Sequence, residues 1–162
     1  MNNYSWLQKK LHSLALSTSF MREATFDAEQ SFLIKESHQD NHVFITGLAR
    51  SGTTALLLAI HESKKFASLS YDDMPFVLAP NLWSKLSYKK KYSESQERAH
   101  GDGIKISTNS PEAFEEVFWK TYDDQEEDSD HKFESYVNLI LKKYRKKRYL
   151  SKNNQNIRRL TI

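Results

Sequence analysis

The chain has 162 residues, of which 38% are hydrophobic and 28% charged, a composition typical of one soluble domain with a core of its own. Its 24 basic and 21 acidic residues give a net charge of +3, too small to indicate a nucleic-acid-binding protein, and no apolar run approaches the ~20 residues of a membrane span. The absence of cysteine excludes disulfides, thiolate zinc sites and a cysteine nucleophile, and it fits a reducing compartment, so we expect a cytoplasmic location.

The first 40 residues are predicted to form a helical region that precedes the rest of the domain. Leu7, Leu11 and Leu14 recur at helical spacing, which predicts an amphipathic helix at the N-terminus. A second helix is expected over 20–35, with Ser19 as its cap.

Strands and helices are predicted to alternate in the core, 41–162. The residues 42–46 are typical of a short buried strand, 53–61 of a helix and 66–69 of a second strand. Two prolines bracket 76–79, which predicts a short helix or an ordered loop, whereas 84–100 is polar and gives a poor signal.

The C-terminal third is predicted to contain two more helices and a third strand. Ser110 is expected to cap a helix that has Pro111 at its first position. The acidic stretch 123–130 is predicted to be a solvated loop, and apolar residues between Phe133 and Tyr144 then recur at helical spacing. The residues 148–152 indicate a strand, after which Asn153 or Asn154 could cap a further helix.

This alternation predicts an α/β protein, a P-loop-like three-layer fold with a parallel sheet. We expect 1–162 to be a single, partial domain that is incomplete at its C-terminus, because the chain stops where another helix and strand should follow. The isolated chain is therefore expected to be marginally stable or prone to aggregation.

The most informative motif is a glycine loop between the predicted strand 42–46 and the helix 53–61. Gly47 and Gly52 keep the G-x-x-x-x-G spacing of a phosphate-binding loop. In such a loop successive backbone N–H groups surround an anion and the following helix directs its positive end toward it. The lysine that a nucleotide triphosphatase has after the second glycine is replaced by Thr53, and Arg50 stands inside the loop. These differences disfavour a kinase or an ATPase, while a tight strand-to-helix turn without a ligand stays open as an alternative.

The string Gly47-Leu48-Ala49-Arg50-Ser51-Gly52-Thr53-Thr54 resembles the 5′-phosphosulfate-binding loop of the sulfotransferase family that uses 3′-phosphoadenosine 5′-phosphosulfate (PAPS). The resemblance continues in 73–76 and in 150–154. It implies a P-loop-like fold, PAPS as the sulfuryl donor, no metal, and an acceptor hydroxyl on a carbohydrate, lipid, small molecule or tyrosyl residue. It also implies that Arg50, Ser51, Gly52, Thr53 and Thr54 hold the 5′ end of the donor.

Two further residues are candidates for catalysis by the same resemblance. Asp73, after the second predicted strand, would be the general base, and Lys152, at the end of the third, would stabilise the bridging oxygen as its bond to sulfur breaks. The carboxyl ends of parallel strands meet at one edge of a sheet, so we expect Gly47, Asp73 and Lys152 to converge. As alternatives, Asp72 could be the base, both carboxylates could merely cap the turn before Pro75, and Lys152 could belong to a basic surface.

The remaining motifs have simpler interpretations. His100 could act as another base, but it stands in a glycine-rich turn, and no histidines and carboxylates have a convincing metal-ligand spacing. The basic run 142–148 is interpreted as the solvated end of a helix rather than a nucleic-acid site. No Arg and Ser pair that would bind the donor's 3′-phosphate is recognisable, so we expect half a site and no turnover of PAPS by this chain alone. The alternative function is a non-catalytic fragment that binds an anion or a partner through its loop and basic tail.

Overall fold

The computed structural model describes residues 19–31, 41–87, 96–97, 105–107, 109–122 and 128–159. The helix predicted near Leu11 and the residue His100 lie outside these ranges. In chain order the elements are α2 (Ser19–Gln30), β1 (Val43–Ile45), α3 (Thr53–His61), β2 (Phe66–Ala67), the 3₁₀ turn η1 (Tyr71–Asp73), α4 (Pro80–Leu86), β3 (Gln96–Glu97), β4 (Lys105–Ile106), α5 (Glu115–Trp119), α6 (Ser129–Tyr144), β5 (Arg148–Lys152) and the 3₁₀ helix η2 (Asn154–Arg158).

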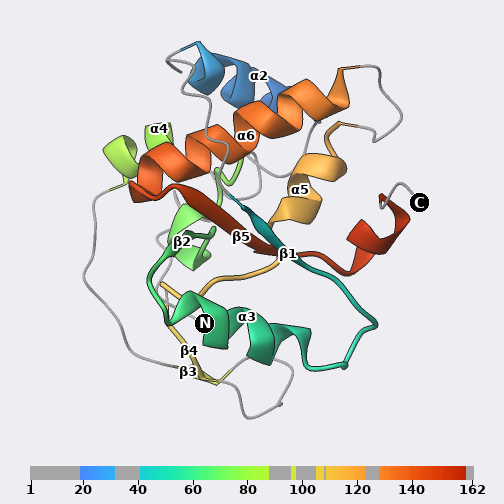
Figure 1. The fold of residues 1–162 in the computed structure, drawn as a ribbon. Coiled ribbons are helices and arrows are strands. Elements are labelled where there is room, and N and C mark those ends of the chain that lie inside the picture. Colours follow the sequence, from blue (N-terminus) through green and yellow to red (C-terminus); the bar gives the residue numbers. More distant parts are fainter. Residues whose placement is uncertain are drawn as a thin grey trace.

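A small parallel sheet forms the centre of the domain, as Figure 1 shows. Its strand order is β1-β5-β2, so the last strand in sequence lies between the first two. Val43 is in register with Leu150, and Phe66 with Arg148. The expectation of an α/β protein with a parallel sheet is therefore confirmed, and β3 and β4 add a separate antiparallel pair that the sequence did not predict.

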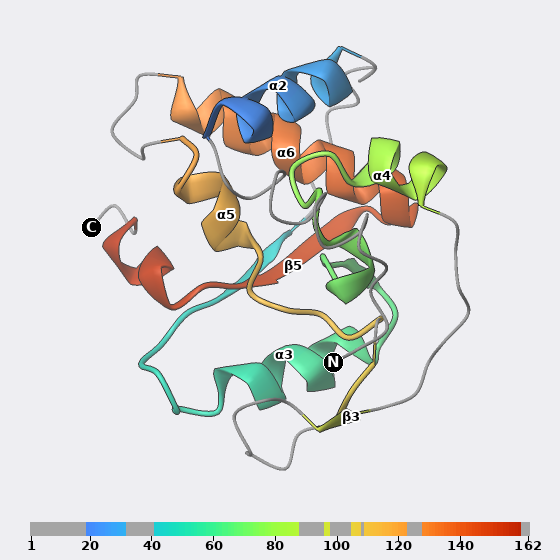
Figure 2. The ribbon, with the colours of Figure 1, turned by 180° about the vertical axis from the view of Figure 1, so that it is seen from behind.

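Helices cover both faces of this sheet. Successive side chains of β5 point to opposite faces and are buried on both, so each face needs a covering layer. Tyr149 belongs to the larger core, to which α2, α5 and α6 contribute Phe26, Phe118 and Tyr136. Leu150 points to the opposite face, where it packs with Leu57 of α3 and with Ile45. Figure 2 shows the same order of layers from behind, with α3 on one side of the sheet and α6 on the other.

Most of the predicted elements are present, and several have the predicted bounds. Helix α3 covers 53–61 and strand β5 covers 148–152, as predicted, and α6 carries the apolar positions between Phe133 and Tyr144. Helix α2 begins at Ser19 itself and ends at Gln30, short of the expected Lys35. The acidic stretch 123–130 is not wholly a loop, because 129–130 belong to the first turn of α6.

The prediction of a helix capped by Ser110 is wrong. Pro111 instead forms an isolated antiparallel bridge with Ser70, and the N–H of Glu112 donates to the carbonyl of Leu69 at 3.1 Å. This extended pairing holds 110–112 beside the chain that leaves β2, so the helix cannot start until Glu115. None of the helices in the described ranges is long and apolar enough to cross a membrane.

Candidate functional site

The carboxyl ends of β1 and β5 lie side by side and define one edge of the sheet. Directly after these strands, the N–H of Asn153 donates to the carbonyl of Ile45 at 3.0 Å, and the Thr46 hydroxyl lies 3.4 Å from the carbonyl oxygen of Asn154. The glycine loop that follows β1 and the residues that follow β5 are thereby held at the same place. This is the edge at which ligands bind to open parallel sheets.

The two glycines of the loop are required for different reasons. A Cβ on Gly47 would lie 3.1 Å from both the Ser51 hydroxyl and the Thr53 methyl group, so crowding favours glycine there. Gly52 has open space around it but a φ of 82°, which is a left-handed conformation that L side chains rarely adopt. Between them, Arg50 also has a positive φ of 68°, and a hydrogen bond of 2.7 Å from the Ser51 hydroxyl to the Leu48 carbonyl closes the turn.

The loop leads directly into α3, whose N-terminal residue after the cap is Thr53. Its N-cap is Gly52, which has no side chain to accept a hydrogen bond from the first turn. The N-terminal turn of a helix attracts anions through these N–H groups and through the helix dipole. Arg50 is exposed at the same end of α3, so a cationic side chain and a helix N-terminus lie together.

Lys152 reaches this turn from the end of β5. Its Nζ donates to the hydroxyl of Thr54 at 3.2 Å, although the two residues are 98 positions apart. Both side chains are half-buried. The structure therefore brings Lys152 to the glycine loop, so of the expected convergence of Gly47, Asp73 and Lys152 the part that joins the loop and Lys152 is present.

Asp73 is placed differently from the other candidates. It is fully buried, and its hydrogen bonds in the described chain are to Ser70, Lys143 and Tyr144. Ser70 and Asp73 form a capping box around η1, with the Ser70 N–H donating to the carboxylate at 2.7 Å. These contacts match the alternative in which the carboxylate caps the turn before Pro75, and none of them joins Asp73 to the loop or to Lys152.

Lys143 and Tyr144 at the end of α6 complete the surroundings of Asp73. The Tyr144 hydroxyl donates to Asp73 at 2.6 Å, and the Lys143 ammonium forms an ion pair with the other carboxylate oxygen. Burial, and next the negative charge of Asp73, raise the pKa of the Tyr144 hydroxyl far above its ordinary value. Tyr144 is therefore a neutral hydrogen-bond donor to the carboxylate. No local pattern indicates this cluster, because Lys143 and Tyr144 are 70 and 71 positions away from Asp73 in the sequence.

A second polar network holds the residues after β5. The Asn153 side chain caps η2 by accepting from the Gln155 N–H at 2.9 Å, and it donates to Glu116 at 2.7 Å. Glu115, which is buried, accepts from Asn156 at 2.8 Å and lies 3.2 Å from the Tyr149 hydroxyl. These bonds fix the path of the chain just beyond Lys152, and the role of Asn153 as a cap is confirmed.

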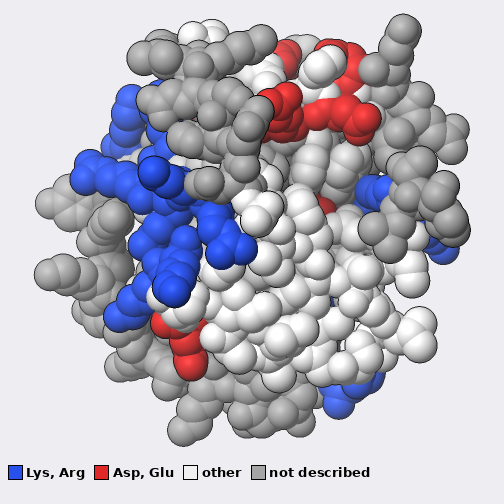
Figure 3. All heavy atoms as spheres, viewed as in Figure 1, with Lys and Arg blue, Asp and Glu red and all other residues white. Residues whose placement is uncertain are grey.

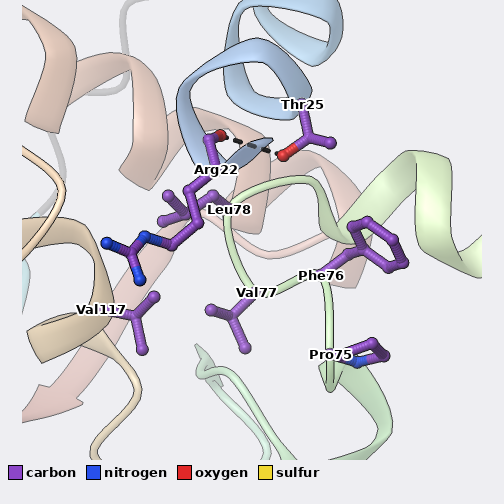
Figure 4. A pocket seen from close by; sticks show the side chains of 7 residues that line it. All are labelled: Arg22, Thr25, Pro75, Phe76, Val77, Leu78 and Val117. Atoms are coloured by element: carbon purple, nitrogen blue, oxygen red, sulfur yellow. Dashed lines mark hydrogen bonds between the residues drawn. The ribbon is translucent and has the colours of Figure 1, made fainter. Parts of the chain in front are cut away.

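A small pocket lies on another side of the molecule, between α2 and the segment 75–78, and Figure 4 shows it from close by. It has a volume of about 190 Å³, including space open to solvent, and it is lined mainly by apolar side chains with Arg22 and Thr25 at its rim. The pocket contains none of the residues of the glycine loop and is separate from the candidate site.

Within the described residues no group of three or more histidine, aspartate and glutamate side chains is arranged to hold a metal ion. Comparison of the chain with protein family models, with curated proteins and with solved structures finds no match. The features that indicate a function are therefore the geometry of the sheet edge and the resemblance of its loop.

Proposed function

We propose that the chain binds the 5′-phosphosulfate end of PAPS at the carboxyl edge of the sheet, as part of a sulfotransferase. The observation that supports this most is the hydrogen bond between Lys152 and Thr54. This bond holds a cation from β5 against the first turn of α3, and Arg50 stands in the loop that leads into the same helix. A helix N-terminus with two cations suits an anion of limited charge without a metal.

The reaction needs few protein groups. The acceptor hydroxyl oxygen forms a bond to sulfur while the bond between sulfur and the bridging phosphate oxygen breaks, and adenosine 3′,5′-bisphosphate leaves. Negative charge grows on the bridging oxygen, and Lys152 would stabilise it there. The hydroxyl proton passes to a base, which is Asp73 by the family resemblance.

A catalytic role for Asp73 requires the carboxylate to exchange a present partner for the acceptor hydroxyl. Its oxygens now accept from Ser70, Lys143 and Tyr144, and it has no exposed surface. This observation favours the second candidate function, a module that binds the anion without transferring it. In a complete enzyme Asp73→Asn would lower turnover by about 10²–10⁴ if Asp73 is the base.

Thermal unfolding with added nucleotide tests the proposed site. Adenosine 3′,5′-bisphosphate should raise the melting temperature of the wild-type chain and have little effect on Arg50→Ala, with Lys120→Ala as a control for the loss of one exposed cation. The chain alone is expected to bind the nucleotide without turning over PAPS. Equal shifts in all three proteins would reject the loop as the binding site, and sulfate transfer by the isolated chain would reject the half-site expectation.

A further inference from the structure

A group of exposed and half-buried cations lies at the opposite edge of the sheet from the glycine loop. It consists of Lys64 and Lys65, which precede β2, and of the residues 145–148, which follow α6 and end with the first residue of β5. We call this group the basic edge. Its six cations come from two turns that parallel pairing brings together, since Phe66 is in register with Arg148. Figure 3 shows Lys and Arg side chains gathered in one area on that side of the molecule.

Direct contacts hold the two turns against each other. Lys146 Nζ donates to the Lys64 carbonyl at 2.6 Å. The Arg148 guanidinium donates to the Asn41 carbonyl and lies 4.5 Å from the centre of the Phe66 ring. The like charges are therefore held close together by the fold. Burial, and next the positive charge of Lys146, lower the pKa of His61 at the end of α3, as a positive local potential should.

The two turns carry more cations than the capping of two helices explains. Lys64 has a φ of 58° and Arg145 a φ of 52°, both in the left-handed region where glycine is favoured after a helix. A cation near a helix C-terminus is favourable in itself, which accounts for one charge at each turn. It does not account for six cations on one edge, with Glu62 as the acidic residue of these turns.

The chemistry of the basic edge favours a flat anionic surface as its partner. Most of its cations are lysines, which act as point charges rather than as planar readers of bases. Its aromatic neighbours offer no stacking platform, because Arg148 covers Phe66 and Tyr144 is engaged with Asp73. Nearby, the end of α4 carries Lys85 and an isolated apolar side chain, Leu86, which is 78% exposed. Figures 1 and 2 agree that this end of α4 lies beside the end of α6.

We propose that the basic edge docks the protein onto an anionic lipid surface, with Leu86 entering the headgroup layer. Each Lys or Arg near an anionic leaflet adds to the electrostatic attraction between the protein and the membrane. An exposed apolar side chain adds hydrophobic burial in the interface, which charge alone does not provide. The glycine loop follows the carboxyl end of β1, so the candidate nucleotide site faces away from the lipid and stays accessible. The proposal is independent of the proposed sulfotransferase activity.

Co-sedimentation with lipid vesicles tests this lipid-docking proposal. The vesicles consist of phosphatidylcholine alone, or of phosphatidylcholine with about 30% phosphatidylserine, at about 0.15 M salt. The wild-type chain should bind the anionic vesicles only. Lys65→Glu/Lys147→Glu should lower binding at least about tenfold, whereas Lys120→Glu/Arg158→Glu, with the same change in net charge at exposed positions elsewhere, should lower it far less. If the first pair fails to fold, Lys65→Gln/Lys147→Gln replaces it.

Leu86→Ser separates a lipid surface from other polyanions. It should weaken vesicle binding several-fold and leave binding to a duplex oligonucleotide unchanged, because only the bilayer offers apolar contact. The proposal is overturned if the two charge-reversed pairs lose vesicle binding equally, if the wild-type chain does not bind anionic vesicles, or if it binds the duplex more tightly than the vesicles.

Discussion

The ammonium of Lys152 and the hydroxyl of Thr54 are joined by a hydrogen bond of 3.2 Å across 98 positions of sequence. Lys152 ends β5, and Thr54 lies in the first turn of α3. Their contact shows that the sheet places a cation from one strand against the helix that follows another. Without it, the loop of 47–54 would be an isolated strand-to-helix turn.

Lys152→Ala should weaken the binding of adenosine 3′,5′-bisphosphate by about 1.5–3 kcal/mol, since a charge-assisted hydrogen bond to the 5′-phosphate is lost. Titration calorimetry measures this. Lys152→Arg keeps the charge and should restore part of the affinity, which a merely structural lysine would not require. Unchanged affinity in Lys152→Ala would remove this residue from the site.

Arg50 should affect stability and binding in opposite directions. Its φ of 68° is unfavourable for a residue with a Cβ, so Arg50→Gly should leave the free energy of unfolding unchanged or raise it by up to about 1 kcal/mol. The same substitution should weaken nucleotide binding by about 1.5–3 kcal/mol. Urea unfolding and calorimetry on one preparation measure both quantities. A parallel fall in stability and affinity would mean that Arg50 supports the loop rather than the ligand.

Asp73→Asn should lower the free energy of unfolding by about 3 kcal/mol, because it leaves the Lys143 ammonium without its buried partner. Lys143→Met combined with Asp73→Asn removes the unpaired ammonium while an amide oxygen still accepts from Ser70 and Tyr144, and should recover part of this loss. Asp72→Asn, at an exposed neighbour, is the matched control and should change stability by less than about 0.5 kcal/mol. A negligible effect of Asp73→Asn on urea unfolding would show that the cluster is not structural.

Glu29 provides a prediction on pH. It is 2% exposed and accepts hydrogen bonds from the N–H groups of Asn81 and Leu82 at the start of α4. Burial is the largest influence on its carboxyl group and raises its pKa above the ordinary value of 4.5, so the folded state takes up a proton at a higher pH than the unfolded state. This group's contribution to stability is then fully present below 4.5 and is lost as the pH rises through the folded pKa.

The free energy of unfolding of the wild-type chain, compared with that of Glu29→Gln, should therefore be greater near pH 4.5 than at neutral pH. Urea unfolding at the two pH values measures the difference. Glu134→Gln, at an exposed position on α6, is the control and should show no such trend. A wild-type advantage that grows as the pH rises would contradict the sign of the effect.

Much of the fold could be predicted because local signals were strong. The apolar positions of α6 recur with helical period, and β5 has Tyr149 and Leu150 between polar residues, so the bounds of both were predicted closely. The prediction of a helix start at Ser110 is wrong because Pro111 and Glu112 pair instead with Ser70 and Leu69, which are more than 40 positions away in the sequence. Such pairing leaves no trace in the sequence around Pro111.

The candidate site was predicted in part for the same reason. The glycine loop carries its geometry locally, in the spacing of Gly47 and Gly52, and the rule on strand ends placed Lys152 beside it. Asp73 also follows a strand, but its side chain is determined by Ser70 in the same turn and by Lys143 from a distant helix. The position of a residue at a sheet edge does not specify where its side chain forms hydrogen bonds.

The most direct test of the central claim is calorimetric titration of adenosine 3′,5′-bisphosphate into the wild-type chain and into the double variant Arg50→Ala/Lys152→Ala. We expect the nucleotide to bind the wild-type chain at one site and not to bind the double variant, while both proteins unfold cooperatively in urea. Absence of binding to the folded wild-type chain, or equal affinity in the two proteins, would contradict it.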